Sequence, residues 1–453
     1  MCAELGFEPT TDQSVFIEHL FRFLYSSDVS ELLLLKGYAG TGKTSIIAAL
    51  TKVLRRQKHK TILLAPTGRA AKVLSAYSAK KSFTIHRKIF RKYSDSEGIV
   101  RFGVAENTHT NTLFIVDEAS MIGDERNGFT GNSLLSDLLE YIYSGDNCKL
   151  LFCGDVAQLP PVGTTLSPAL NPDYLRNNYS FSVHSCELKE VVRQAADSGI
   201  LFNATSMRVQ LMQTERQSPQ LQEFSDVIKI NGSELEDALN SAYARYSEEN
   251  VLVVTRSNKR ANQFNQQIRM RIKYRDELIN GGDLMMVVKN NYQALDENSK
   301  AGFIANGDAI EILKVIRIKE MYGMQFAEVV FRMLDYPEEP EINYLLNLIV
   351  IDSEHPSMTQ EQQRMFAALV LQDIGPNATR AEQISYLRNN PYYSALQVKF
   401  SYAVTCHKSQ GGQWPCVFID KGFIPQGESN EDYYRWLYTA ITRATEKVYL
   451  INF

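Results

Sequence analysis

The chain has 453 residues, of which 44% are hydrophobic and 22% charged, and its formal net charge at pH 7 is −4. This length exceeds one ordinary hydrophobic core, so we expect several domains. The composition excludes a disordered chain, and no apolar run approaches the roughly 20 residues that cross a bilayer. Six scattered cysteines form no C-x-x-C pair, which indicates neither a zinc ribbon nor a disulfide framework. We therefore expect a cytoplasmic protein that does not enter a membrane.

Basic residues are concentrated in two stretches although the net charge is negative. Lys and Arg far outnumber Asp and Glu between Thr51 and Arg101, and a second basic stretch covers 258–275. Solvated helix faces explain such stretches about as well as local phosphate-binding surfaces do. Charge alone therefore leaves nucleic-acid binding open.

Short apolar runs recur along the chain with stretches between them that are long enough for helices. The first four lie at 32–36, 61–65, 113–117 and 150–154. Runs of this kind, joined by crossovers, are typical of a parallel α/β sheet. A second set follows at 251–255, 416–420 and 447–453. The sequence therefore predicts an α/β fold with two parallel-sheet lobes, the second built from distant pieces.

Two insertions interrupt this pattern. Residues 89–107 read as two short strands around SDSEG, which predicts a β-hairpin. Residues from about 285 to 400 alternate like small antiparallel strands and include a polar helical arm at about 357–390. The predicted domains are 1–195 for the first lobe, with the hairpin insertion at about 86–110; 196–284 and 400–453 for the second lobe; and 285–399 for the inserted β-module with its arm.

The stretch GYAGTGKTS at 37–45 has the spacing of a nucleotide phosphate loop (P-loop), between an apolar run and a plausible helix. Its glycines allow backbone N–H groups to surround phosphates at a helix N-terminus. Lys43 would neutralise the β and γ oxygens of ATP, and the Thr44 hydroxyl would coordinate Mg²⁺. The expected nucleotide contacts are Gly37, Ala39, Gly40, Thr41, Gly42, Lys43, Thr44 and Ser45.

Polar residues after later apolar runs complete a candidate ATPase site. Asp117 can hold Mg²⁺ through water, while Glu118 can orient and deprotonate the attacking water. Gln158, in GDVAQLPPVG, could sense the γ-phosphate. Arg193 in the first lobe and Arg443 in the second could approach the same phosphate as arginine fingers, which stabilise transition-state charge.

Small hydroxyls and cations at predicted helix starts suggest contacts to a nucleic-acid strand. They lie in APTGRAAKVL at 65–74, in TIHR at 84–87 and in TRSN at 255–258. Such groups bind phosphates without reading base sequence. The candidates are Pro66, Thr67, Arg69, Lys72, Thr84, His86, Thr255 and Asn258.

Eight motifs together resemble those of superfamily 1B DNA helicases of the RecD and Dda branch, with the Pif-type enzymes nearby. They are GYAGTGKT, APTGRAAKVL, TIHR, VDEASM, GDVAQLPPVG, VVRQ, VTCHKSQG and YTAITRA, in that order. The resemblance extends from Gln13 to Arg443, and the length and small inserts are most similar to the phage helicase Dda. It implies two RecA-like lobes, an SH3-like inserted β-module and an ATPase site between the lobes.

The resemblance also implies roles for residues that spacing alone does not assign. Gln13, in PTTDQ, would read the adenine. In the late motif VTCHKSQGG, Thr405, His407 and Lys408 would face DNA, whereas Gln410 and Gly411 would lie toward the nucleotide. Further expected DNA contacts are Pro160, Pro161 and Phe102, the last in a hairpin that separates the strands. Packing of Phe102 within the hairpin explains this aromatic residue about as well.

A monomeric, ATP-dependent helicase that moves 5′→3′ on single-stranded DNA and unwinds duplexes in replication, recombination or repair is therefore the expected function. Two alternatives stay open. One is an RNA or RNA–DNA helicase of superfamily 1, because phosphate contacts do not distinguish the two nucleic acids without discrimination of the 2′-OH. The other is a DNA-stimulated switch ATPase that changes shape without translocating.

Overall fold

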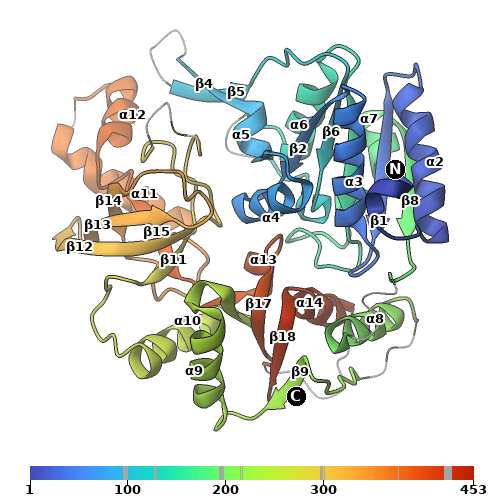
Figure 1. Ribbon diagram of the computed structural model, residues 1–453. Helices are drawn as coiled ribbons and strands as arrows, with labels where there is room; N and C mark the ends of the chain where they lie inside the picture. Colours follow the sequence, from blue (N-terminus) through green and yellow to red (C-terminus); the bar gives the residue numbers. More distant parts are fainter. Residues whose placement is uncertain are drawn as a thin grey trace.

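The computed structural model describes residues 1–94, 100–126, 130–192, 198–214, 216, 218–295, 299, 301–375, 377–422 and 431–453. For residues 2, 3, 92, 94 and 100–102 it describes the backbone but not the side chain. The described elements form two α/β lobes, a closed β-barrel with a helical arm, and a β-hairpin (Figure 1).

Lobe 1 is built on a six-stranded parallel sheet in the order β3-β2-β6-β7-β1-β8. Its strands are β1 (Glu31–Gly37), β2 (Lys60–Ala65), β3 (Ser82–Thr84), β6 (Thr112–Val116), β7 (Lys149–Gly154) and β8 (Ser182–Leu188). Its helices are α1 (Cys2–Leu5), α2 (Thr11–Tyr25), α3 (Lys43–Arg56), α4 (Gly68–Ser78), α5 (Ile85–Ile89), α6 (Leu134–Tyr143) and α7 (Pro172–Tyr179).

The central strands of lobe 1 are buried on both faces, which explains their continuous apolar runs. Because successive side chains point to opposite faces, Leu32 and Leu34 of β1 join one core cluster while Leu33 and Leu35 join another. The first cluster includes residues of α6, and the second includes residues of α2 and α3. Helices therefore cover both faces of the sheet, as the sequence predicted for a parallel α/β lobe.

Lobe 2 contains a five-stranded parallel sheet in the order β16-β10-β17-β18-β9. Its strands are β9 (Val227–Ile230), β10 (Val251–Thr255), β16 (Ala403–Thr405), β17 (Trp414–Asp420) and β18 (Ala444–Ile451). Its helices are α8 (Gly199–Leu211), α9 (Leu235–Tyr246), α10 (Asn258–Gln267), α13 (Cys406–Ser409) and α14 (Glu431–Ile441). The second α/β lobe is thus assembled from distant segments, as predicted.

A closed five-stranded barrel and its arm lie between the two parts of lobe 2 in the sequence. The barrel consists of β11 (Leu284–Val287), β12 (Ala309–Met321), β13 (Met324–Met333), β14 (Ile342–Asn347) and β15 (Leu396–Phe400). The arm, α11 (Gln360–Leu371) and α12 (Arg380–Asn389), connects β14 to β15, and a capping box begins each of its helices. Buried Phe326 of β13 and Phe366 of α11 belong to one core cluster, which fixes the arm against the barrel.

The hairpin consists of β4 (Phe90–Ser94) and β5 (Val100–Val104), which pair antiparallel. Phe102 lies opposite Lys92 in this pairing, and its side chain lies outside the described part of the structure.

Lobe 1 lies above lobe 2 in both views, with the barrel to the left in Figure 1. The described part of the chain holds no helix with both the length and the apolar character needed to cross a membrane.

Candidate nucleotide-binding site

The P-loop connects β1 to α3 and curves around the start of that helix. Gly40 and Gly42 have φ of 74° and 81°, in the left-handed region that glycine adopts without steric cost. Gly42 is the N-cap of α3 and offers no side chain to cap the first turn. The first N–H groups of α3 therefore remain available to an anion, which the helix dipole also favours.

Lys43 lies within the curve of this loop. Its ammonium group donates to the carbonyl oxygens of Gly37 (2.6 Å) and Tyr38 (3.0 Å) and lies 4.0 Å from Oδ2 of Asp155. The Thr41 hydroxyl also donates to the carbonyl of Tyr38, at 2.8 Å. Phosphate oxygens would be stronger acceptors for Lys43 than these neutral carbonyls, because they carry charge. The loop therefore fits a nucleoside phosphate.

Gln13 lies beneath the P-loop and is fully buried. Its Nε2 donates to the carbonyl of Thr41 at 3.0 Å, and its Oε1 accepts from the backbone N–H of Thr10 in the capping box of α2. The structure thus gives Gln13 a direct role in holding the loop. Contact with an adenine would require these bonds to be rearranged or extended, so that role stays a prediction.

Two neighbouring carboxylates follow β6. Oδ1 of Asp117 accepts from the backbone N–H of Glu118 at 2.9 Å. Glu118 has φ of 53°, a conformation that costs a non-glycine residue about 1–2 kcal/mol, and its Oε2 is buried without a hydrogen-bond partner among the described residues. Burial, followed by the charge of Glu118, raises the pKa of Asp117 to about 7.

These features fit a divalent cation at Asp117, whereas the part of the Thr44 hydroxyl in holding it stays a prediction. An orphaned carboxylate oxygen next to a carboxyl with a raised pKa marks a place where positive charge would be favoured. Within the described ranges, no group of three or more His, Cys, Asp or Glu side chains could hold a metal by itself.

Gln158 follows β7 in the segment 155–159. The residue is almost fully buried, and its Oε1 has no hydrogen-bond partner in the part of the chain that the structure describes. Hydrogen bonds connect the same segment to lobe 2. The Leu159 N–H donates to Thr439 Oγ1 at 2.9 Å, Gln410 Nε2 donates to the Leu159 carbonyl at 2.6 Å, and Arg435 donates to the Val156 carbonyl. Gln158, the predicted γ-phosphate sensor, therefore lies in a segment of lobe 1 that is hydrogen-bonded to lobe 2.

Sequence reasoning missed Asp155, Arg435 and Tyr438. The Tyr438 hydroxyl accepts from the N–H of Ala39 in the P-loop at 2.7 Å and donates to Oδ2 of Asp155 at 2.6 Å. One signal was available in the sequence: residues 435, 438 and 439 have the i, i+3, i+4 spacing that places side chains on one face of α14. Nothing in the sequence indicated which surface that face meets.

Gly411 brings the late motif of lobe 2 against the start of α4. Its φ is 73°, and a Cβ added there would lie 2.9 Å from Cβ of Ala70 and 3.1 Å from Oγ1 of Thr67. No side chain larger than hydrogen fits this approach without movement. Gln410 and Gly411 thus contact lobe 1 directly, through Leu159 and through α4.

The two predicted arginine fingers differ in what the structure says of them. Arg193 lies outside the described residues. Arg443 is buried and donates within lobe 2, to the carbonyls of Thr439 (3.0 Å) and Gly412 (3.2 Å) and to Oγ1 of Thr442. Contact of Arg443 with a γ-phosphate would require some of these bonds to be exchanged, so both finger roles stay predictions.

Several predicted DNA contacts lie at helix starts. Thr67 and Thr84 are the N-caps of α4 and α5, where their hydroxyls accept backbone N–H groups. Thr405 precedes α13, and Asn258 begins α10. Thr255 differs: it is fully buried, and its hydroxyl is within hydrogen-bond reach of the carbonyls of Ser257 and Val404. In this conformation the Thr255 hydroxyl is held within lobe 2, and contact of Thr255 with a strand stays a prediction.

The cationic and aromatic candidates contact other parts of the chain. The Arg69 guanidinium stacks over the Trp414 ring at 4.0 Å, which joins α4 to lobe 2. Lys72 donates to the Leu334 carbonyl at 2.9 Å, and Lys408 donates to Oδ1 of Asn306 at 2.7 Å, both near the barrel. His86 packs on the rings of Phe90 and Phe303, and burial lowers its pKa to about 4. A bound strand would have to replace or share these contacts.

Among the described residues, the side chains of the predicted prolines and of His407 make no hydrogen bond, ion pair or ring contact of this kind. Pro66 is partly buried next to the N-cap Thr67, and Pro160 and Pro161 are partly buried after Leu159. His407 is exposed on α13. Their roles in contacting a strand stay predictions.

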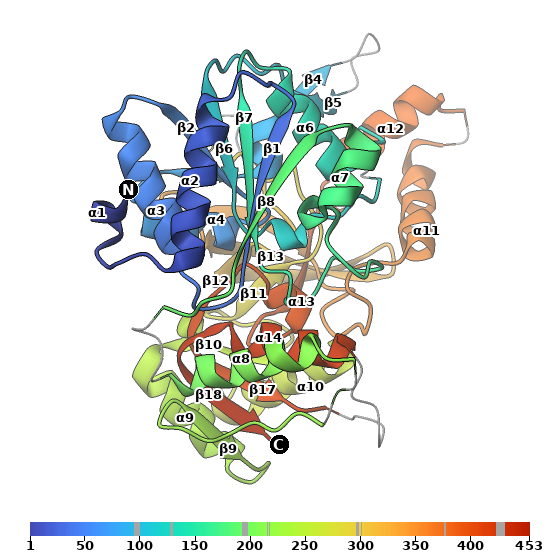
Figure 2. The same cartoon turned by 90° about the vertical axis from the view of Figure 1, so that its right-hand side faces the viewer.

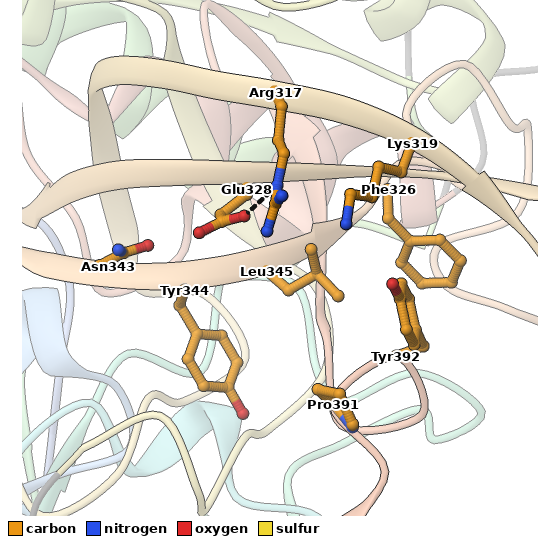
Figure 3. Close-up of a pocket in the computed structure, with 9 residues that line it drawn as sticks. All are labelled: Arg317, Lys319, Phe326, Glu328, Asn343, Tyr344, Leu345, Pro391 and Tyr392. Carbon is orange, nitrogen blue, oxygen red and sulfur yellow. Dashed lines mark hydrogen bonds and ion pairs between the residues drawn. The ribbon is translucent and has the colours of Figure 1, made fainter.

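A cavity of about 370 Å³ lies on the barrel and is separate from these residues. Figure 3 shows its lining, in which Arg317 donates to Glu328 at 2.5 Å and Tyr392 stands beside Phe326. No predicted site residue lines it.

Comparisons with known proteins place two domains along the chain. Residues 13–223 match the family model of the AAA domain, and residues 400–451 match that of the UvrD-like helicase C-terminal domain. An uncharacterised protein of Acanthamoeba polyphaga mimivirus is 22% identical over 523 residues, covering 97% of this chain and 98% of that protein. The ATP-dependent RecD2 DNA helicase of Deinococcus radiodurans is 30% identical over 176 residues, covering 38% of this chain and 21% of that protein.

Among solved structures, the Pif1 helicase from Bacteroides in complex with ADP-AlF3 and single-stranded DNA has 14% sequence identity and a TM-score of 0.48. The alignment covers 99% of this chain and 93% of that one. The range matched by the first family model contains the P-loop of lobe 1, and the range matched by the second contains the late motif of lobe 2.

Proposed function

We propose that this chain, an ATP-dependent DNA helicase of superfamily 1B and of the Pif1/RecD-like type, moves 5′→3′ along single-stranded DNA and unwinds duplexes ahead of it. The direction follows from the family resemblance of its motifs. We further propose that it acts as a monomer in replication, recombination or repair, because both lobes of the ATPase site belong to one chain. The similarity to the phage helicase Dda stays a prediction.

One observation carries the proposal of a motor. Gln410 and Gly411, in the late motif of lobe 2, contact lobe 1 at the Leu159 carbonyl and at α4. The first contact adjoins Gln158, the proposed γ-phosphate sensor, and the second adjoins Thr67, a proposed strand contact. Binding or release of the nucleotide or of the DNA strand would therefore alter contacts that the two lobes share. Coupling of ATP hydrolysis to movement along DNA requires such an arrangement.

In the ATPase site, Lys43 would neutralise phosphate oxygens, and Glu118 would orient the attacking water. Asp117 and Thr44 would hold Mg²⁺, which supplies positive charge to the transferring phosphoryl group when bound. Gln158, in the segment 155–159, would sense the γ-phosphate. We propose Arg193 and Arg443 as arginine fingers once the lobes close on ATP.

On the strand side, we propose that the helix starts at Thr67, Thr84 and Thr405 bind phosphates, aided by Lys408 and the other predicted contacts. The hairpin β4–β5 would separate the duplex, with Phe102 stacking on the last base pair. We also propose the domain boundaries given by the sequence, with the barrel and arm as one inserted, SH3-like unit.

The deciding experiment measures ATP-dependent unwinding of matched duplexes that carry either a 5′ or a 3′ single-stranded tail. We expect unwinding from the 5′ tail alone. Unwinding from the 3′ tail alone would contradict the direction. If neither duplex is unwound while DNA stimulates ATP hydrolysis and streptavidin stays on end-biotinylated strands, the chain is a switch ATPase. Stronger stimulation by poly(U) than by poly(dT) would identify RNA as the substrate.

A further inference from the structure

Tyr438 places a hydroxyl of lobe 2 inside the P-loop region of lobe 1. Its side chain is 1% exposed, and the oxygen accepts from Ala39 N–H at 2.7 Å while donating to Oδ2 of Asp155 at 2.6 Å. Burial, followed by the charge of Asp155, raises the pKa of Tyr438 well above its ordinary value. The hydroxyl therefore keeps its proton and remains a donor at neutral pH.

Asp155 lies between this hydroxyl and the P-loop lysine. Its carboxylate is 1% exposed, Oδ1 accepts from the Ala157 N–H at 2.9 Å, and Oδ2 lies 4.0 Å from Nζ of Lys43. At 4.0 Å this is a loose ion pair, since hydrogen-bonded pairs are about 2.7–2.9 Å apart. The hydrogen bond from Tyr438 thus occupies the carboxylate oxygen that would otherwise attract Lys43.

We propose that Tyr438 is a positioning residue for nucleotide binding: while lobe 2 lies against lobe 1, its hydroxyl holds Asp155 away from Lys43 and keeps that lysine available to phosphates. Separation of the lobes at this contact would release Asp155 to capture Lys43 and weaken the grip on the nucleotide. The inference rests on the proposed ATPase function and adds a route by which lobe movement controls nucleotide affinity.

Removal of the hydroxyl has two opposing effects, and their sizes differ. Ala39 loses an acceptor, which frees one neutral N–H of the P-loop for the nucleotide. Asp155 loses a donor, which leaves a buried carboxylate beside Lys43 with less compensation. The second effect dominates because Asp155 and Lys43 both carry charge, whereas Ala39 offers one neutral donor, and interactions between charged groups are the stronger ones. The net expectation is weaker nucleotide binding.

The test is Tyr438→Phe, which keeps the buried ring and removes only the oxygen. We expect the KM for ATP and the dissociation constant of a non-hydrolysable ATP analogue, measured by calorimetry, to rise roughly tenfold, as for one lost hydrogen bond to a charged group. The value of kcat at saturating ATP should stay within about twofold, because bound phosphates then hold Lys43 in place of Asp155. Tyr243→Phe is the matched control: Tyr243 is a buried tyrosine of lobe 2 whose hydroxyl has no hydrogen-bond partner among the described residues.

A double-mutant cycle shows whether the hydroxyl acts through Asp155. In an Asp155→Asn background the charge is gone, so Tyr438→Phe should change analogue affinity by less than about twofold. Unchanged or tighter binding by Tyr438→Phe would overturn the proposal, and so would an equal effect in both backgrounds. A joint loss of kcat, affinity and thermal stability would show a packing role and also overturn it. Failure of the parent chain to hydrolyse ATP would instead count against the proposed function, since the analogue titration needs no turnover.

Discussion

Gly411→Ala adds one methyl group where the late motif of lobe 2 meets lobe 1. The new Cβ would lie 2.9 Å from Cβ of Ala70, a helix atom that side-chain rotation cannot move. Carbon atoms in good contact are about 3.5–4.0 Å apart, so the contact is too short by about 0.6–1.1 Å. Overpacking of this kind costs about 1–3 kcal/mol. Since the clash exists only when the lobes meet, it should act against lobe closure.

This energy corresponds to a roughly 5- to 150-fold loss of the closed arrangement. We expect single-stranded-DNA-stimulated ATP hydrolysis by Gly411→Ala to fall by at least fivefold at saturating oligo(dT), and binding of ADP to the P-loop to weaken as well, because separated lobes would release Asp155 to Lys43. Steady-state hydrolysis with and without oligo(dT), together with ADP titration calorimetry, measures both quantities.

Backbone strain contributes separately, and a matched control removes it. Gly411 has φ of 73°, so alanine costs about 1–2 kcal/mol there in any arrangement of the lobes. Gly323, in the turn between β12 and β13, has φ of 68°, and nothing lies within 4 Å of its added Cβ. Gly323→Ala should therefore lower the melting temperature by a similar amount and leave stimulated hydrolysis intact. Equal stimulated activity of the two variants would refute the reasoning.

Three further predictions concern single side chains. Lys43→Ala should abolish ATP hydrolysis because it removes the only side-chain cation of the P-loop; turnover in a steady-state phosphate-release assay would exclude this loop from the mechanism. Gln158→Ala should lower kcat by roughly 100- to 1,000-fold, the usual range for a lost transition-state hydrogen bond, with little loss of thermal stability, because Oε1 has no partner to lose among the described residues; unchanged kcat in stopped-time assays would contradict the sensor role. Burial raises the pKa of Cys406 to about 12, so its reactive thiolate should be scarce at pH 7.5, and iodoacetamide treatment followed by peptide mass spectrometry should find Cys406 unmodified and ATPase activity retained.

The fold class could be predicted from local pattern because each parallel strand is a short apolar run buried on both faces. Phe114 and Leu150, in the middle of such runs, are fully buried in lobe 1. The long connection between the parts of lobe 2 was visible as a change from these runs to alternating strands. The closure of those strands into a barrel depends on pairing between β11 and β15, which lie far apart in the sequence.

The P-loop and the Asp117–Glu118 pair were determined by the sequence itself, because their chemistry depends on neighbouring residues along one loop or one strand end. Several single-residue roles were not determined in this way. Thr255 follows a strand just as Asp117 does, yet it is buried with its hydroxyl turned to lobe 2 carbonyls. Arg69 begins a helix as a phosphate ligand would, yet it stacks on Trp414. Burial and partners of this kind depend on which surface the other lobe covers.

Only the tertiary structure placed the hydroxyl of Tyr438 between Ala39 and Asp155, and Gly411 against Ala70. These residues are separated by hundreds of positions, and no periodicity or spacing connects them. Hydrogen bonds and van der Waals contacts act over a few ångströms, so such pairs exist only after the two lobes have folded and packed together. The sequence by itself supplied the groups that we propose bind nucleotide, and the packing of the lobes decided which groups of one lobe contact the other.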